Sequence, residues 1–288
     1  MLIPMTPDLR DLVRRLVPRP VRNVARSPRQ SLAWAWDEVS YRMGRVRRCA
    51  LADGWTVTCH PAAAHAFRTH LRDDEFQREL GDFRTCCRPG MRMVDVGAHY
   101  GVFTLAALHY GAGARVLAVD PSPVAARVLR ANVALAGATD RVEIVEAAVG
   151  AEEGTLRMLS TGPVSTHYMV LADGNRPDAR AIRMTTLAAL SARLPGGPTH
   201  VKIDVEGFEE AVIAGGAAML ARLHPVVHLE LHGRMIRERG GDAAAPLALL
   251  ERLGYARFQS AGRVVTPSQA AAQDLVRLVC LPAGGSPG

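Results

Sequence analysis

Short apolar runs alternate with segments of helical periodicity along most of the chain. The runs at 92–96, 115–119, 142–146, 199–204 and 226–231 are predicted to be buried strands. Helices are predicted at 101–110, 122–136, 187–193, 209–222 and 243–253, and two late strands near 255–259 and 275–281. This alternation predicts an α/β fold with a mostly parallel, doubly wound sheet and helices on both faces.

Two further segments complete the predicted domain. Residues 160–180 are polar, rich in Gly, Pro and Asp, and lie between short predicted strands at 155–159 and 181–184. A loop of this length inside a compact domain is typical of a lid or a binding loop. Before the first core strand, the pattern predicts a short strand or hairpin at 50–60 and a helix at 72–87.

The N-terminal residues 1–48 are basic and compatible with helix, but Pro18 and Pro20 interrupt them. We interpret them as an extension that precedes one large domain at 49–288. The extension could pack on the domain, bind an anionic membrane surface, or contact a partner protein, including a second copy of the chain in a homodimer.

Composition limits the cellular compartment and the partners that we expect for the chain. No run of 18 apolar residues occurs, so no membrane span is expected, and charges occupy the place where a signal peptide needs its apolar stretch. The five cysteines form no C-x-x-C pair, which favours the reducing cytoplasm over a disulfide framework. The net charge is +7, but beyond the first fifty residues the arginines are dispersed, so nucleic acid is not expected as a partner.

The strand at 92–96 runs into an acid-x-Gly-x-x-x-Gly turn, a pattern typical of nucleoside-binding sites. Gly97 and Gly101 carry no side chain, so the backbone there can approach a ligand closely. The next strand ends at Asp120, which lies 25 positions after Asp95. A carboxylate at that place can accept hydrogen bonds from both ribose hydroxyls.

The turn also limits which nucleoside can bind. Dinucleotides need a G-x-G-x-x-G turn for their pyrophosphate, and Lys202, the only lysine, follows no Walker A loop. An acid at the strand end suits a ligand with an amine and a sulfonium, which is S-adenosylmethionine. Asp95 would hold the methionine amine and Asp120 the ribose. Further cofactor-binding candidates adjoin these two residues: Ala98, His99, Pro121 and Ser122.

A second motif places two more carboxylates at the same sheet edge. Asp204 and Glu206 follow the strand at 199–204, and ligands of parallel sheets bind outside the carboxyl ends of the strands. Methyl transfer to an aliphatic hydroxyl requires a base or a metal to handle its proton. Asp204 is the first candidate for orienting or deprotonating the acceptor, with Glu206 beside it. Alternatively, the two carboxylates pair with Lys202 or cap the helix that begins at Glu209.

The strand at 226–231 carries a third polar group. His228, Glu230 and His232 share one parity, so we expect them on one face of the strand. His232 is a further catalytic candidate. Together with Asp204 these residues could hold a divalent cation such as Mg²⁺ or Mn²⁺, although histidines in such strands are more often hydrogen-bonded core residues. We therefore assign no residue as a metal ligand. His167 in the predicted lid is an alternative base.

These motifs resemble the FkbM-type family of S-adenosylmethionine-dependent methyltransferases. The matching segments cover about residues 70 to 260: DVGAHYG at 95–101, AVDPSP at 118–123 with Asn132, RMTTL at 183–187, VKIDVEGFEEAVIAGG at 201–216 and PVVHLELH at 225–232. The resemblance implies a Rossmann-like class I methyltransferase fold and an enzyme of EC class 2.1.1. It implies methyl transfer to a hydroxyl of a sugar, a polyketide or a related natural product, and so a small-molecule or glycosylated acceptor.

The resemblance implies one further site residue, and the sequence departs from the family pattern at two positions. Glu75 is similar to the acidic position that often precedes the family's glycine turn, so it joins the cofactor-binding candidates. His99 stands where the family usually has Asn, and Ala188 where it usually has Asp. An alternative function is a noncatalytic small-molecule or nucleoside-binding protein with a methyltransferase-like fold.

Overall fold

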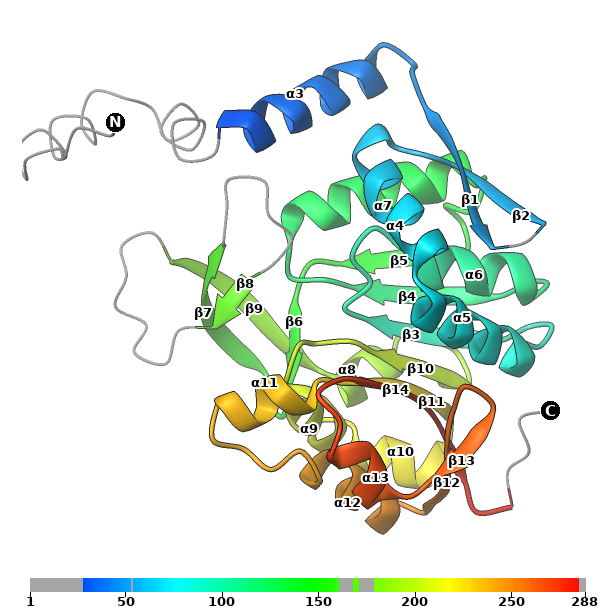
Figure 1. Cartoon of the computed structure of the whole chain (residues 1–288), viewed down its shortest axis with the longest axis vertical. Helices are drawn as coiled ribbons and strands as arrows, with labels where there is room; N and C mark the ends of the chain where they lie inside the picture. Colours follow the sequence, from blue (N-terminus) through cyan, green and yellow to red (C-terminus); the bar gives the residue numbers. More distant parts are fainter. Residues whose placement is uncertain (1–27, 53, 161–167, 171–178, 285–288) are drawn as a thin grey trace, which may run out of the picture.

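The protein is described here from a computed structural model that covers residues 28–52, 54–160, 168–170 and 179–284. Its main element is an eight-stranded sheet (Figure 1). The parallel part runs in the order β5 (Val142–Val145), β4 (Arg115–Val119), β3 (Arg92–Val96), β10 (His200–Ile203) and β11 (Val226–Leu231). Beyond β11 the antiparallel strands are β14 (Val276–Pro282), β12 (Tyr255–Ser260) and β13 (Arg263–Val265).

Helices cover both faces of this sheet, as the sequence predicts. Successive strand residues point to opposite faces, so Met93 packs into one core while Val94 and Val96 pack into the other. The first core is completed by α4 (Ala64–Arg72), α5 (Asp74–Cys86), α6 (Val102–Tyr110) and α7 (Pro123–Leu135). The second is completed by α8 (Leu187–Ser191), α9 (Glu209–Ala214), α10 (Ala217–Leu223) and α12 (Ala245–Arg252). The mostly parallel, doubly wound α/β sheet is thereby confirmed.

The predicted helix 209–222 is wrong in one respect, because it is two helices, α9 and α10. The break falls at Gly215 and Gly216. A Cβ at Gly215 would collide with the carbonyl oxygen of Gly150, and one at Gly216 would press on Leu187. The chain therefore bends where two glycines let neighbouring elements approach. The short helices α11 (Gly233–Glu238) and α13 (Pro267–Ala271) have no counterpart among the predicted elements.

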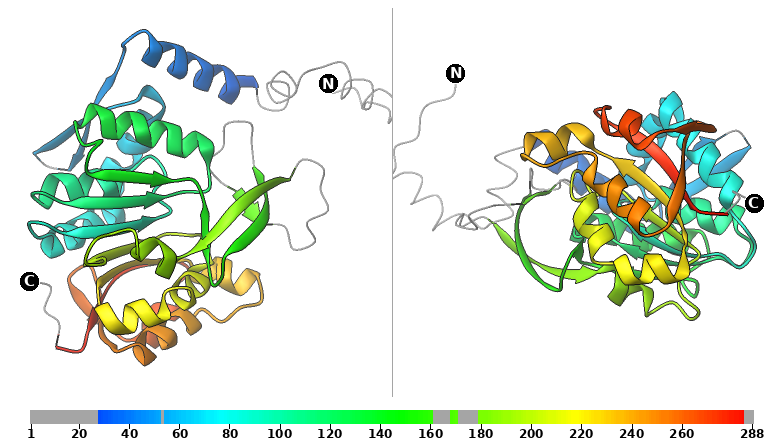
Figure 2. Two further views of the ribbon diagram at one scale, coloured as in Figure 1. Left: turned by 180° about the vertical axis from the view of Figure 1, so that it is seen from behind. Right: turned by 90° about the horizontal axis from the view of Figure 1, so that it is seen from below.

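A four-stranded sheet stands beside the carboxyl ends of the main strands (Figure 2). Its order is β6 (Ala148–Gly150), β9 (Arg180–Thr186), β7 (Gly154–Ser160) and β8 (Tyr168–Val170). The predicted loop 160–180 thus contains a strand, β8, which pairs antiparallel with β7. Residues 161–167 and 171–178, with His167, lie outside the described residues, so the lid stays a prediction.

The described N-terminal part begins with α3 (Pro28–Arg42) and the hairpin β1 (Arg47–Ala52) and β2 (Trp55–Cys59), which confirms a hairpin near 50–60. A 3-10 turn, η1 (Pro61–Ala63), follows and contacts α3. The proposed boundary at residue 48 falls within β1 and stays a prediction. All five cysteines are free and buried. Within the described ranges, no helix has the length and apolar character needed to cross a membrane.

Candidate active site

The strand order of the main sheet reverses between β3 and β10, and the site lies at this point. From β3 the chain continues to β4 and β5 on one side, whereas β10 and β11 extend the sheet on the other. The loops that leave β3 and β10 diverge, which opens a crevice at the carboxyl ends of the strands. A cavity of about 760 Å³ occupies this crevice, within the range expected for small-molecule sites.

The glycine turn after β3 forms the floor of the cavity. Gly97 has φ +82°, and a Cβ there would collide with the backbone carbonyl oxygen of Asp204. Gly101 has φ +89°, and its Cβ would meet Leu129. Packing therefore requires a glycine at position 97, whereas at position 101 the positive φ favours one. Gly101 does not line the cavity. His99 adopts φ +50°, a conformation that Asn tolerates better than most residues, which accounts for Asn at this place in the family motif.

Asn132 of α7 holds this turn from behind. Its Nδ2 donates a hydrogen bond to the carbonyl of Tyr100 at 2.9 Å, and its Oδ1 accepts one from the backbone N–H of His60 at 2.7 Å. The side chain is fully buried. One amide thus connects the glycine turn, α7 and the segment before α4, which explains its place in the motif without a contact to a ligand.

Asp120 directly follows β4 and lines the cavity, and two backbone N–H groups orient its carboxylate oxygens. Oδ1 accepts the N–H of Ser122 at 2.8 Å and Oδ2 accepts the N–H of His99 at 2.9 Å. Burial raises the pKa of Asp120 to about 7, against the lowering effect of these two N–H groups. Each oxygen retains a lone pair for a ligand hydroxyl. Pro121 also lines the cavity, whereas Ser122 is buried and caps α7 by accepting the N–H of Ala125.

Asp95 lies deeper, on β3, with its side chain toward the core formed by α4 to α7. It is 2% exposed, and Thr104 donates a hydrogen bond to it at 2.6 Å. Burial raises the pKa of Asp95, and the hydroxyl of Thr104 opposes this. Asp95, Gly97, Ala98 and His99 all line the cavity, as the sequence predicts for a shared binding surface.

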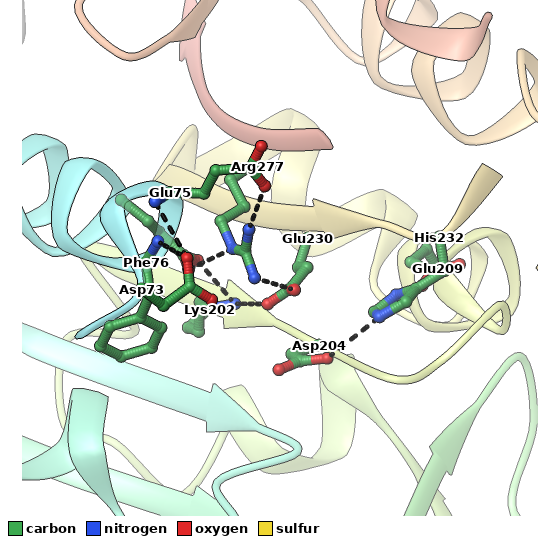
Figure 3. Close-up of polar contacts among 10 residues, drawn as sticks. Asp73, Glu75, Phe76, Lys202, Asp204, Glu209, Glu230, His232 and Arg277 are labelled. Atoms are coloured by element: carbon green, nitrogen blue, oxygen red, sulfur yellow. Dashed lines mark hydrogen bonds and ion pairs between the residues drawn. The ribbon is translucent and has the colours of Figure 1, made fainter. Parts of the chain in front are cut away.

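A buried network of ion pairs (Figure 3) forms part of the cavity wall at the β10 end, where Lys202, Glu230 and Arg277 line the cavity. Lys202 lies 3.1 Å from Glu79 and 3.7 Å from Glu230, and Arg277 contacts the same two carboxylates at 2.9 and 3.0 Å. Burial alone would raise the pKa of Glu230, but the two cations lower it and keep this carboxylate ionised. Burial would lower the pKa of Lys202, but the surrounding carboxylates raise it.

Asp204 lies beside the charged residues of this network. Its side chain borders the cavity and is 36% exposed. Burial of the carboxyl raises the pKa of Asp204 to about 8, and the ionised Glu230 raises it further, whereas Lys202 and His232 act in the opposite direction. A hydrogen bond with Asp204 also helps to keep Glu230 ionised. Near neutral pH, Asp204 therefore holds a proton that it can exchange.

His232 lies behind Asp204 and does not line the cavity. Its Nδ1 is 2.8 Å from Oε1 of the fully buried Glu209, and its Nε2 is 3.8 Å from Oδ1 of Asp204. Burial would lower the pKa of His232, but the bond with Glu209 raises it. His232 can therefore act on a ligand only through Asp204. Glu206, at φ +51°, does line the cavity, and Arg239 donates to its carbonyl oxygen.

His228 and Glu230 lie on one face of β11, opposite Val227 and Leu229, as the sequence predicts, but the predicted inclusion of His232 is wrong. His228 is buried between the rings of Phe83 and His200, at centroid distances of 4.8 and 6.0 Å. Its strand ends at Leu231, so the alternation does not extend to His232. Ligand atoms of Asp204, Glu230 and His232 do lie within 4.8 Å of one another. However, Glu230 is already paired with two cations, so the set fits a divalent ion poorly and we derive no metal chemistry from it.

Glu75, predicted as a cofactor-binding residue, does not line the cavity. It is 70% exposed on α5 and pairs with Arg277 at 3.2 Å, outside the cavity. The buried acid of α5 is Glu79, one turn further along the helix. Ala188, the second departure from the family motif, is exposed on α8 and also lies outside the lining.

Sequence reasoning missed much of the cavity wall. One side comes from α4, with His65, Thr69 and His70. The opposite side is apolar, with Leu156, Met158 and Met184 of the smaller sheet, and continues to Phe208, whose ring Arg239 covers at 4.2 Å. The rule that ligands bind beyond the carboxyl ends of strands indicates the segment after β5. The strands predicted at 155–159 and 181–184 are confirmed as β7 and β9, but nothing local in the sequence indicates that they line the cavity.

Comparisons with known proteins agree with the motifs. A family model described as the methyltransferase FkbM domain matches residues 95–256. Ribosomal protein L11 methyltransferase of Pelotomaculum thermopropionicum is 29% identical over 151 residues, 48% of this chain and 48% of that protein. The same enzyme of Chloroflexus aurantiacus is 37% identical over 73 residues, 25% of this chain and 22% of that protein. The chain thus spans about half, or less, of the length of these curated relatives.

Two of the solved structures that resemble this chain are named as methyltransferases. Methyltransferase FkbM from Methylobacillus flagellatus KT has a TM-score of 0.46 and 16% identity, covering 76% of this chain and 59% of that one. An O-methyltransferase from Bacillus cereus has a TM-score of 0.36 and 12% identity, covering 71% and 78%. The family model, which spans more than half of the sequence, decides the assignment: the chain belongs to the FkbM family of methyltransferase domains.

Proposed function

We propose that the protein transfers a methyl group from S-adenosylmethionine to a hydroxyl of a small acceptor, such as a sugar, a polyketide or a related natural product, which can be glycosylated. The observation that carries this proposal is Asp120, a buried carboxylate oriented by two backbone N–H groups, beside the glycine turn and facing the 760 Å³ cavity. Family membership supports the same reaction.

The described residues fit the methyl donor. Asp120 keeps free lone pairs for the ribose hydroxyls, and Asp95 offers a buried carboxylate for the methionine amine. The glycine turn leaves its backbone open to the cavity at Gly97 and Ala98. When bound there, S-adenosylmethionine supplies an electrophilic methyl group on a positively charged sulfur.

Asp204 is the residue that we assign to the acceptor proton. Its carboxyl borders the cavity, and with a pKa of about 8 it is ionised in a fraction of the molecules at neutral pH. An ionised Asp204 can accept the hydroxyl proton as the oxygen attacks, which is general base catalysis. Glu206, on the same wall, can orient the acceptor. His232 and Glu209 act behind Asp204, where a protonated imidazole favours the ionised carboxylate.

The five buried thiols fit the reducing cytoplasm that the sequence predicts.

The alternative function, ligand binding without catalysis, makes a different prediction for the carboxylates at the cavity. Binding alone does not require a base, whereas methyl transfer to a hydroxyl does.

The test is mass spectrometry of hydroxylated small molecules incubated with the full chain and S-adenosylmethionine. A product heavier by one methyl group, formed by the wild type and about 10²- to 10⁴-fold more slowly by Asp204→Asn, supports the proposal. Equal turnover by both proteins would show that Asp204 is not the base. A methyl group found on nitrogen would overturn the assignment to hydroxyl acceptors.

A further inference from the structure

Helix α3 turns large apolar side chains toward solvent. Trp36, Val39 and Met43 are 60%, 47% and 64% exposed. Trp36 and Val39 lie on one face of α3, and Met43, the first residue after the helix, continues that face because its N–H still bonds to the carbonyl of Val39. Val46 follows directly and is 36% exposed. In the described part of the chain, the one other large apolar residue this exposed is Val264. Surface helices ordinarily bury an apolar face, so the exposure of this one indicates a binding surface.

The opposite face of α3 packs on the protein through Trp34, Glu38 and Tyr41. Glu38 is 13% exposed and lies 3.7 Å from His60 and 3.6 Å from Arg127. Arg127 also lies over the ring of Trp34, and the ring of Tyr41 lies 4.5 Å from that of His60. Because these contacts fix the rotation of the helix, the apolar face is displayed outward by the fold itself.

Positive charge adjoins this apolar face. Four arginines at the end of α3 and the start of β1 are exposed: Arg42, Arg45, Arg47 and Arg48. In the full sequence, residues 1–48 hold 11 of the 35 basic and 4 of the 28 acidic residues, which leaves 24 of each kind in residues 49–288. The whole net charge of +7 is therefore carried by the N-terminal extension, and the rest of the chain is balanced.

From this segregation we propose that α3 and the adjoining Val46–Arg48 segment bind the surface of an anionic lipid bilayer. Such a surface offers an apolar boundary for Trp36, Val39 and Met43, and phosphate groups for the arginines beside them. A second copy of the chain fits less well. In a twofold dimer the same patch meets itself, so the exposed arginines would face one another.

The test uses the full chain with vesicles of phosphatidylcholine and with equimolar phosphatidylcholine and phosphatidylglycerol. Trp36 is the reporter, since Trp55 is 4% exposed and Trp34 lies under Arg127 at 4.5 Å. We expect cosedimentation with the anionic vesicles only, together with a blue shift of tryptophan emission. The shift should disappear in both Trp36→Phe and Trp36→Ala, because both lack the reporter, whereas cosedimentation should weaken more in Trp36→Ala than in Trp36→Phe. Added salt should weaken the binding.

Two variants and a matched control locate the surface. Met43→Ser and Arg45→Glu should each weaken vesicle binding by about tenfold or less, and the pair by more. Val264→Ser, equally exposed but on β13, should leave it unchanged. Circular dichroism confirms that each variant is folded.

Three results would overturn the proposal: no binding to anionic vesicles, equal binding to neutral vesicles, or a fluorescence shift without lipid that follows self-association in sedimentation. Binding to RNA in place of lipid would do the same. No methyl donor is present in these measurements, so their failure leaves the proposed reaction untouched.

Discussion

Opposing influences act on the protonation of the Asp204 carboxyl group. Asp204 borders the cavity beside Glu230 and Lys202, and His232 lies behind it. Burial and the ionised Glu230 favour the protonated form, whereas the two cations favour the carboxylate. The balance places its proton exchange close to physiological pH, which is what a general base needs.

The activity should therefore depend on pH through Asp204. If the carboxylate form is the base, the rate rises with pH and levels off above the pKa of about 8. Glu209→Gln should move this rise to higher pH, because the less basic His232 is then less often protonated and no longer favours the carboxylate. The measurement is kcat/KM against pH. A rise that is unchanged in Asp204→Asn would contradict the role of Asp204.

Asp120 should make the stability of the ligand-free protein depend on pH. Its pKa is raised by burial to about 7, so the folded protein keeps a proton that the unfolded chain releases above about pH 4. The stabilisation from this proton is complete below the unfolded pKa and is lost as pH rises through about 7. Urea unfolding from pH 5 to 8 should show this decline, and the decline should be shallower in Asp120→Asn. An equally steep decline in the variant would assign it to other groups, such as Asp204.

At the level of the elements, two glycine-dependent contacts join the strands that form the site. Gly97 allows the turn after β3 to lie against the end of β10, and Gly215 allows α9 to approach β6. Neither contact follows from local sequence pattern, because each depends on a residue far along the chain. The apolar runs, in contrast, predict β3, β4 and β11 almost to the residue, since buried parallel strands need continuous apolar sequence.

Gly97→Ala should destabilise the protein by about 2–4 kcal/mol, because a Cβ adds positive-φ strain and a collision with the backbone of Asp204. Gly90→Ala is the matched control. Gly90 has φ +70° but open space around it, so the cost should be about 1 kcal/mol. Urea unfolding measures both. Equal losses would show that the close approach of Gly97 to β10 contributes nothing.

The buried ion network joins α5, β10, β11 and β14 through Glu79, Lys202, Glu230 and Arg277. Lys202→Met leaves two buried carboxylates with one cation, which should cost about 3–5 kcal/mol. Lys202→Met combined with Glu79→Leu should recover part of this loss, because one uncompensated charge is removed as well. Chemical unfolding of the single and double variants measures the recovery, and an equal or larger loss in the double variant would contradict it.

The same network explains why the sequence misplaces part of the site. Glu75 and Glu79 lie one turn apart on α5 and both pair with Arg277, but Glu79 is the one that reaches the buried Lys202, which lies far along the chain. His228 and His232 have the same parity, but the strand ends between them. Motifs therefore predict which strand ends form the site, whereas the direction of each side chain is set by long-range contacts.

In the whole molecule, the net charge and the candidate active site belong to different segments of the chain. Residues 49–288 are balanced in charge and contain every described residue that lines the cavity, whereas residues 1–48 carry the net charge. Composition alone gives a net charge of +7 for the whole chain and does not show that residues 1–48 carry it. The fold class followed from the alternation of strands and helices, because a doubly wound sheet repeats the same unit along the chain.

Isothermal titration of S-adenosylmethionine into the full chain tests the central claim most directly. We predict one site per chain, an affinity at least about tenfold weaker in Asp120→Ala, and little change in Asp204→Asn and in Glu75→Gln, which lies outside the cavity. Absence of binding, or equal affinity in the wild type and Asp120→Ala, would contradict the account.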